Sequence, residues 1–185
     1  MAEIISPGCE RGIPGNVEMP LSVERLPNGN TLIADGGDEA GFGSEVVEVD
    51  PLGNIVWRYG EGLRFAHSAR RLKNGNTLIT DTTNNRIIEV TPDKRIVMDS
   101  DEWGGGTGRL SDGSHLHYPN EAFELQDGTL LVTDRNNDRC IQVDRNGNLL
   151  WSFDRELHHP HNANPLPNGN ILVSDSDGNR ILEVN

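Results

Sequence analysis

A unit repeated four times constrains the fold of this chain more than any other feature of its sequence. Four segments align on a common glycine and read SVERLPNGNTLIAD (22–35), SARRLKNGNTLITD (68–81), EAFELQDGTLLVTD (121–134) and NANPLPNGNILVSD (162–175). A second strand-like run follows each final aspartate, and three copies continue into a third run, GNIVWRY, KRIVMDS and GNLLWSF. The Asn-Gly or Asp-Gly pair between two such runs predicts a β-hairpin with a type I′ turn. Each unit therefore predicts a four-stranded antiparallel sheet of about 45 residues, the size of a propeller blade.

We expect an all-β fold, a single β-propeller domain over residues 1–185 with four four-stranded blades. A single sheet of this kind cannot bury both of its faces, so neighbouring sheets must pack on it. The expected blades span about 19–60, 65–103, 117–154 and 159–185.

The last unit lacks a fourth strand, and residues 2–6 (AEIIS) are expected to supply it and to cover the open sheet edge. Closure within one chain would give a four-bladed ring. Closure between two chains would give an eight-bladed ring from a homodimer. The sequence leaves both arrangements open.

Charge and hydropathy narrow the classes of partner. The net charge is −13, which argues against nucleic acid and against anionic membrane surfaces. No apolar run approaches the ~18 residues that a membrane span needs. The first sixteen residues show neither a basic flank nor an apolar core of a signal peptide, so we expect a cytoplasmic protein. Of the two cysteines, Cys140 is expected in the core and Cys9 as a free thiol in a Gly/Pro-rich loop.

The repeats resemble those of a known group of proteins. The stretch PLPNGNILVSDSDGNRILEV (165–184), together with GNIVWRY and GNLLWSF, resembles repeats of bacterial and archaeal propellers of the arylsulfotransferase-like and pyrroloquinoline-quinone-enzyme-like groups. NHL-type and streptogramin-lyase propellers are looser relatives. The resemblance covers nearly the whole chain and is carried by turn and strand residues. It implies a propeller and, from the arylsulfotransferases, a channel histidine that accepts sulfate with help from other histidines and an arginine.

One face of the predicted propeller carries the longer loops. With strands lettered a to d from the channel outward, the d–a and b–c connections emerge together on this face. Two of them are extended, Asp35–Ser44 and Asp99–Tyr118. Long loops inside compact domains are often binding loops, although tolerated insertions are the alternative. We therefore expect any small-molecule or protein partner at this face.

Two neighbouring positions of the repeat begin strand a at the mouth of the channel on that face. The first reads Leu21, His67, Asn120 and His161 around the ring, and the second reads Ser22, Ser68, Glu121 and Asn162. Blade order places His67 and His161 opposite each other. They could hold a divalent metal ion or an anion, or one of them could act as a base. The simpler interpretation is that they satisfy backbone groups or line a water-filled channel. The candidate ligand-binding residues are Asn120, Glu121, Asn162, His117 and His159.

Arginines complete the candidate site and the expected scaffold. Arg70 and Arg71 follow His67 on strand a, and one of them could pair with an anionic ligand, a salt bridge being the alternative. An aspartate recurs five residues before an arginine, across the b–c turn, in Asp81/Arg86, Asp134/Arg139 and Asp175/Arg180, while Asp35 faces Glu45 in the first unit. Recurrence in three units favours a scaffold role for these pairs.

Two functions follow from the sequence. The first is a ligand-binding or assembly propeller that uses its loop-rich face. The second is an enzyme of sulfuryl-transfer or lyase type at the channel mouth. In the enzyme, His161 would be the nucleophile or base, His67 its partner, and Arg70 or Arg71 the anion holder.

Overall fold

The computed structural model describes residues 17–38 and 40–185 and shows four antiparallel sheets. Blade 1 contains β1 (Pro20–Arg25), β2 (Thr31–Asp35), β3 (Glu45–Val49) and β4 (Ile55–Tyr59). Blade 2 contains β5 (Ala66–Arg71), β6 (Thr77–Asp81), β7 (Arg86–Val90) and β8 (Ile96–Asp99). Blade 3 contains β9 (Pro119–Glu124), β10 (Leu130–Asp134), β11 (Arg139–Val143) and β12 (Leu149–Phe153). Blade 4 contains β13 (Pro160–Pro165), β14 (Ile171–Asp175) and β15 (Arg180–Val184).

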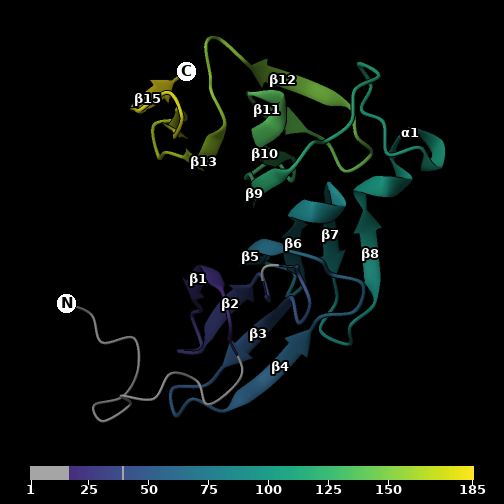
Figure 1. Ribbon diagram of the computed structural model, residues 1–185, viewed down its shortest axis with the longest axis vertical. Helices are drawn as coiled ribbons and strands as arrows, with labels where there is room; N and C mark the ends of the chain where they lie inside the picture. The colour runs from purple at the N-terminus through teal and green to yellow at the C-terminus, as the bar shows by residue number, and fades with distance from the viewer. Residues whose placement is uncertain (1–16, 39) are drawn as a thin grey trace.

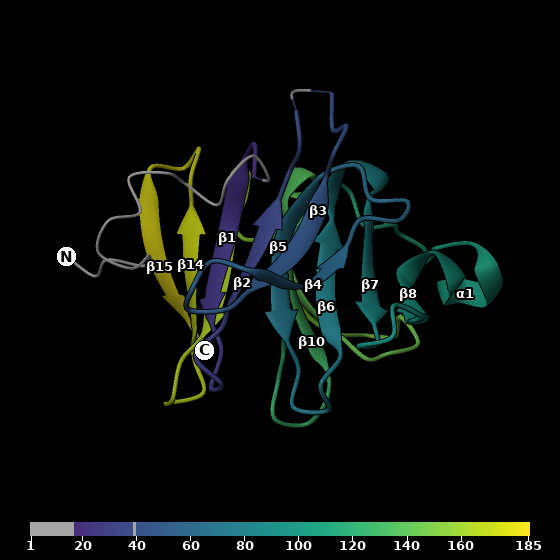
Figure 2. The ribbon, with the colours of Figure 1, turned by 90° about the horizontal axis from the view of Figure 1, so that it is seen from below.

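The sheets are arranged as the four blades of a β-propeller, as the repeats predict. Figure 1 shows the blades fanned around a common centre, with β1, β5, β9 and β13 innermost, and Figure 2 shows the strands from the side. Extensive contacts join β1 to β5, β5 to β9 and β9 to β13. Blades 1 and 4 lie at the two ends of this arc, and within the described ranges no contact of that extent joins them. The strand expected from residues 2–6 lies outside the described residues.

The hairpins form where the sequence predicts them, but the predicted type I′ turn is wrong. In each a–b turn only the glycine has a positive φ, for example +89° at Gly29, while Asn28 has none. The Gly29 amide donates to the carbonyl of Leu26, whose own amide donates to the carbonyl of Asn30. This is a three-residue turn that ends in a left-handed glycine. The asparagine side chains instead bind the neighbouring strand, since Asn28 and Asn30 both donate a hydrogen bond to Glu48 on β3.

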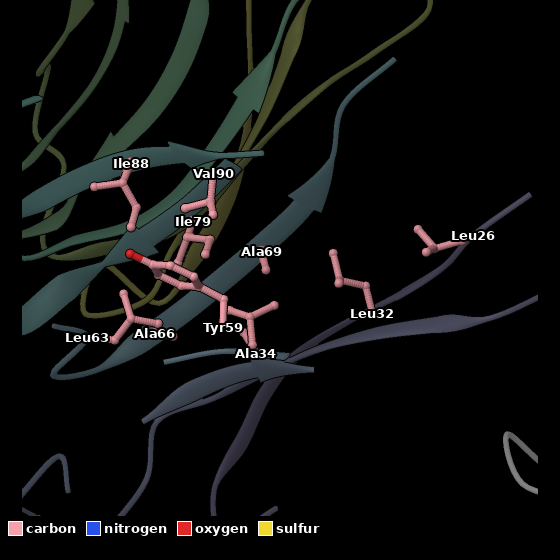
Figure 3. Close-up of a cluster of buried hydrophobic side chains, with 11 residues drawn as sticks. Leu26, Leu32, Ala34, Tyr59, Leu63, Ala66, Ala69, Ile79, Ile88 and Val90 are labelled. Carbon is pink, nitrogen blue, oxygen red and sulfur yellow. The ribbon is translucent and has the colours of Figure 1, made fainter. Parts of the chain in front are cut away.

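Aliphatic side chains fill the space between adjacent blades. Between blades 1 and 2, Leu32 and Ala34 pack against Ala69, Ile79 and neighbouring residues (Figure 3). Two further clusters lie between blades 2 and 3 and between blades 3 and 4, the first around Leu78, Leu130 and Ile141 and the second around Leu131, Ala163 and Val173. The indoles of Trp57 and Trp151 pack on these clusters, which agrees with a role in blade packing.

Cys140 is a core residue, as its sequence context predicts. Its side chain is fully buried, and burial raises the pKa of its thiol to about 12. A thiol reacts as the thiolate. In a Cys9→Ser variant we therefore expect no reaction of Cys140 with a colorimetric thiol reagent at pH 8 until denaturant unfolds the chain. A stoichiometric reaction of the folded variant within minutes would show that the core is open there. Cys9 lies outside the described residues.

The longest connection, residues 99–118, is anchored to the propeller. It contains a 3₁₀ turn, η2 (Ser100–Glu102), a short helix, α1 (Trp103–Gly106), and a single bridge between Arg109 and His115. Trp103 is buried, and its indole N–H donates to the carbonyl of Arg145 over 3.0 Å. Across the described ranges, no helix is long and apolar enough to cross a membrane.

Candidate functional site

A β-bulge at one position of every inner strand builds the candidate site. The pairing of each inner strand with its neighbour skips one residue, and the skipped residues are Leu21, His67, Asn120 and His161. A bulge turns a side chain away from the regular alternation of a strand, and bulges are frequent next to active sites. The four positions that the repeat register predicts at the channel mouth are therefore set there by the same backbone irregularity.

The structure brings the two predicted histidines together. The ring centroids of His67 and His161 lie 5.0 Å apart, with their planes at 60°. His67 is buried, whereas His161 is exposed. The pKa of His67 is lowered to about 4, mainly because the imidazole is buried and secondly because of the nearby charge of His161. A backbone hydrogen bond with Asn120 acts in the opposite direction and raises the pKa. His67 is therefore neutral at pH 7.

A chain of hydrogen bonds orients His161. The Asn162 amide nitrogen Nδ2 donates to Glu121 Oε2 over 2.8 Å, which leaves Asn162 Oδ1 as the acceptor facing His161 Nδ1, also at 2.8 Å. The proton of a neutral His161 is therefore assigned to Nδ1, and Nε2 keeps a lone pair. Glu121 is held in turn by Arg70, which donates to its Oε1. Side chains from three blades thus hold the imidazole of His161 in place, and its Nε2 takes part in none of these hydrogen bonds.

Neither predicted anion holder is free in the structure. Arg70 pairs with Glu121 of the next blade, and its guanidinium lies 4.5 Å from the centre of the Phe123 ring. Arg71 pairs with Glu48 over 2.7 Å and lies over Trp57. Both arginines therefore form the salt bridges that the sequence offers as the alternative to anion binding.

The repeated aspartates hold the loops that lead into the site. Asp134 accepts a hydrogen bond from the backbone N–H of His117 over 2.7 Å, and Asp175 accepts one from His158 over 2.6 Å. The expected ion pairs are all present, with Arg86 Nε, Arg139 Nε and Arg180 Nε 2.7–2.9 Å from their aspartates. Asp35 faces Glu45 in blade 1, also as expected. These fully or almost fully buried carboxylates hold each d–a loop just ahead of its bulged residue, as expected of scaffold residues.

His117 and His159 contribute to the loops rather than to the histidine pair. His117 is exposed, and its backbone is held by Asp134. His159 has a positive φ, its backbone N–H donates to Asp138, and its ring Nδ1 lies 2.7 Å from Asp177 Oδ2.

Arg135 is a site residue that the motif analysis missed. It begins a 3₁₀ turn, η3 (Arg135–Asn137), directly after Asp134 on the loop-rich face. Its Nη1 donates to Asn136 Oδ1 over 3.0 Å. Burial and then His161 are the main causes that lower the pKa of His67, and the hydrogen bond with His159 is the main cause that lowers the pKa of Asp177; the positive charge of Arg135 makes a smaller contribution to each. The repeat offers a signal for it, since the same position is Gly36, Thr82 and Ser176 in the other blades. A cation where the other blades have small or hydroxyl residues marks blade 3 as different.

Other polar groups at the site bear on which ligand could bind. Asn120 is 2% exposed, and its Oδ1 has no hydrogen-bond partner. Burying a carbonyl oxygen without a donor costs about 1–3 kcal/mol.

A protein metal site commonly draws three or four ligands from the chain. The histidine pair supplies two, and within the described ranges no group of three His, Cys, Asp or Glu residues could hold a metal ion.

Comparison with known proteins supports the fold alone. No protein-family model and no curated protein matches the chain. Similar solved structures include a protein of unknown function from Bacteroides caccae, at 18% identity and a TM-score of 0.66 over 93% of this chain and 65% of that one. A catalytically inactive histidine-to-alanine variant of virginiamycin B lyase from Staphylococcus aureus, with quinupristin, matches at 14% identity and a TM-score of 0.68 over 94% and 55% of the two chains.

The WD40 propeller domain of Doa1 is a further neighbour, at 11% identity and a TM-score of 0.66 over 89% of this chain and 50% of that one. The chain thus spans between half and two thirds of the length of these proteins. At such low identities the shared feature is the β-propeller fold.

Proposed function

We propose that the channel mouth on the loop-rich face is a binding site for a small polar ligand. The observation that carries this proposal is the hydrogen-bonded chain of side chains from three blades, Arg70, Glu121 and Asn162, which ends on His161 and leaves its Nε2 unbound. Arg135 adds a positive charge, and neutral His67 forms one wall. A ligand with an N–H or O–H donor for Nε2 and an anionic or strongly polar group for Arg135 suits this arrangement.

A second candidate is general-base catalysis at the same site. A histidine whose Nδ1–H is held by a side-chain oxygen presents Nε2 as a base, which is how many enzymes orient a catalytic imidazole. The structural likeness to virginiamycin B lyase and the resemblance of the repeats to arylsulfotransferase-like propellers support testing lyase and sulfuryl-transfer substrates first. Fold likeness alone does not carry an activity from one propeller to another.

Binding is tested by thermal shift with divalent metals, aryl sulfates, sugars and quinupristin. A ligand at about 100 times its Kd stabilises the native state by about 2.7 kcal/mol and raises Tm accordingly. The His161→Ala variant should keep the Tm of the free protein and bind about 10–100-fold more weakly, because a hydrogen bond of roughly 1.5–3 kcal/mol is lost. His158→Ala is the matched control, since it removes a neighbouring exposed imidazole and keeps the backbone N–H that Asp175 binds.

The two functions separate in a turnover assay with the same variants. Conversion of quinupristin or an aryl sulfate by the wild type and His158→Ala, but not by His161→Ala, would establish the enzyme. If the ligand binds but is not converted, the result would support the binding function and not the enzyme. A ligand-induced Tm shift that His161→Ala retains in full would place the ligand elsewhere and refute the proposed site.

A further inference from the structure

A cavity of about 500 Å³ opens at the rim of the propeller between blades 2 and 3. One wall is β8, the outermost strand of blade 2, and the other is formed by α1 and by the c–d turn of blade 3. Figure 2 shows α1 projecting beyond β8 at this end of the molecule. This rim cavity is defined by the four residues of β8 together with Glu102, Trp103 and Arg145.

The cavity lies where blade 2 departs from the repeat at one position of its outer strand. Strand d of blades 1 and 3 carries a tryptophan, Trp57 or Trp151, at the position where β8 has Met98. The indole of Trp57 crosses to the next blade, where its N–H donates to the carbonyl of Pro92 over 3.0 Å. Methionine has neither the ring nor the N–H that makes this contact, so β8 does not close the gap to blade 3.

Trp103 makes the same contact from the other side of the gap. Its indole N–H donates over 3.0 Å to the carbonyl of Arg145, which is the counterpart of Pro92 in blade 3. A Cβ at Gly147 would lie 2.7 Å from Trp103 Cγ, so the ring packs directly on the turn. The Ser111 amide also donates to the carbonyl of Gly147. The wall opposite β8 is therefore fixed to blade 3, and the cavity is preformed.

The outer edge of β8 is open along this cavity. β8 is the last strand of its sheet, and among the described residues its backbone forms hydrogen bonds with β7 alone. Ile96 and Val97 are 43% and 52% exposed, and all four residues of β8 line the cavity. Since the side chains of a strand alternate between its two faces, a cavity that touches four consecutive residues runs along the edge of the strand. The backbone groups on such an edge are those that pair with an added strand.

The charges of the cavity favour a basic partner. Arg145 is compensated by glutamates of both blades, and Asp99 pairs with Arg86 over 2.9 Å. Glu102 is exposed and forms no ion pair within the described part of the chain. A lysine or arginine of an added strand would supply the charge that this carboxylate lacks.

We propose that the rim cavity binds an extended, basic segment of a partner protein, which adds to blade 2 as a fifth strand beside β8. The backbone of the segment pairs with the open edge of β8. One apolar side chain contacts Met98 and Trp103, and a lysine or arginine pairs with Glu102. This site lies apart from the channel mouth and does not rest on the function proposed there.

A library of random heptapeptides displayed on phage, panned against the folded full chain, supplies the probe. The enriched peptides should contain alternating β-branched residues and at least one lysine or arginine. A synthetic, fluorescein-labelled copy of the most enriched peptide then gives Kd by fluorescence anisotropy. Hydrogen–deuterium exchange of the complex should show slower exchange at residues 96–99 and no change at 149–153, the outer strand of blade 3.

Variants of the protein test the side-chain contacts. Met98→Trp places in β8 the residue that blades 1 and 3 carry there, and Glu102→Lys reverses the charge of the cavity, so each should weaken binding by about 10-fold or more. Glu61→Lys, which alters another exposed glutamate, and His161→Ala at the channel mouth should keep the wild-type Kd. Circular dichroism checks that each variant is folded, and Glu102→Lys alone decides if Met98→Trp does not fold.

N-methylated copies of the peptide test the backbone pairing. Methylation of alternate amides removes the hydrogen-bond donors from one edge of an extended peptide and leaves the other edge intact. Of the two complementary sets of methylation, one should abolish binding and the other should leave Kd unchanged. A contact made by side chains alone would not distinguish the two sets.

Four results would overturn the proposal. They are a library that yields no enriched peptide, enriched peptides that are acidic, a Kd that Glu102→Lys leaves unchanged, and equal effects of the two sets of methylation.

Discussion

Replacing Asp134 with alanine is expected to destabilise the protein by about 3–5 kcal/mol, the range for removing one partner of a buried ion pair. Asp134 is fully buried and accepts hydrogen bonds from three groups, the His117 amide, Asn137 Nδ2 and Arg139 Nε. Alanine leaves all three without that acceptor and frees the loop that enters β9. Urea unfolding followed by tryptophan fluorescence measures the change.

Two variants make this prediction specific. Asp134→Asn should cost clearly less than Asp134→Ala, because an amide oxygen can still accept from the loop. Burial also raises the pKa of the Asp134 carboxyl, which shows that its charge is costly where it lies. Asp93→Ala breaks an ion pair with Arg95 on the surface, where both side chains are more than 60% exposed, and should leave the midpoint unchanged. If Asp134→Ala and Asp93→Ala lowered the free energy of unfolding equally, the repeated aspartate would have no scaffold role.

The repeat predicts the blades, their order and the scaffold pairs, because these depend on local signals that recur in register. Turn glycines, strand-forming residues and an aspartate five residues before an arginine each report a contact within one unit. The type of turn was not predictable in the same way. The pair Asn28-Gly29 points to a type I′ turn by propensity, but the side chain of Asn28, together with that of Asn30, holds Glu48 on another strand.

The position of the candidate site was predictable from the sequence, but the contacts between its side chains were not. The register places His67 and His161 at the channel mouth, yet it cannot show that a bulge aims both at the same point. The link from His161 through Asn162 to Glu121 crosses two blades and depends on side-chain geometry. The pairing of Arg70 with Glu121 joins residues 51 positions apart, so sequence spacing gives no indication of it.

Acidification should destabilise the protein through His67, and a His67→Gln variant should lack this part of the pH dependence. The pKa of His67 is about 4 in the folded protein against 6.5 for an unperturbed imidazole. Between these values the unfolded chain binds the proton and the folded protein does not, so unfolding is favoured as the pH falls. The stabilisation is complete above pH 6.5 and lost by pH 4. Since each unit of pKa difference corresponds to 1.36 kcal/mol, the difference between 6.5 and about 4 changes the free energy of unfolding by about 3 kcal/mol.

The comparison of variants isolates this contribution from those of the carboxylates. Burial raises the pKa of Glu45, Asp101 and Asp134, and these groups change the stability in the opposite direction as the pH falls. They are present in both proteins, so the difference between the two urea-stability curves from pH 7 to pH 4.5 reports His67 with the charges that face it, His161 and Arg135. The wild type should lose about 2 kcal/mol more than His67→Gln over this range, while a His158→Gln control should follow the wild type. Parallel curves for the wild type and His67→Gln would mean that His67 titrates normally, and the neutral wall assigned to the site would then be wrong.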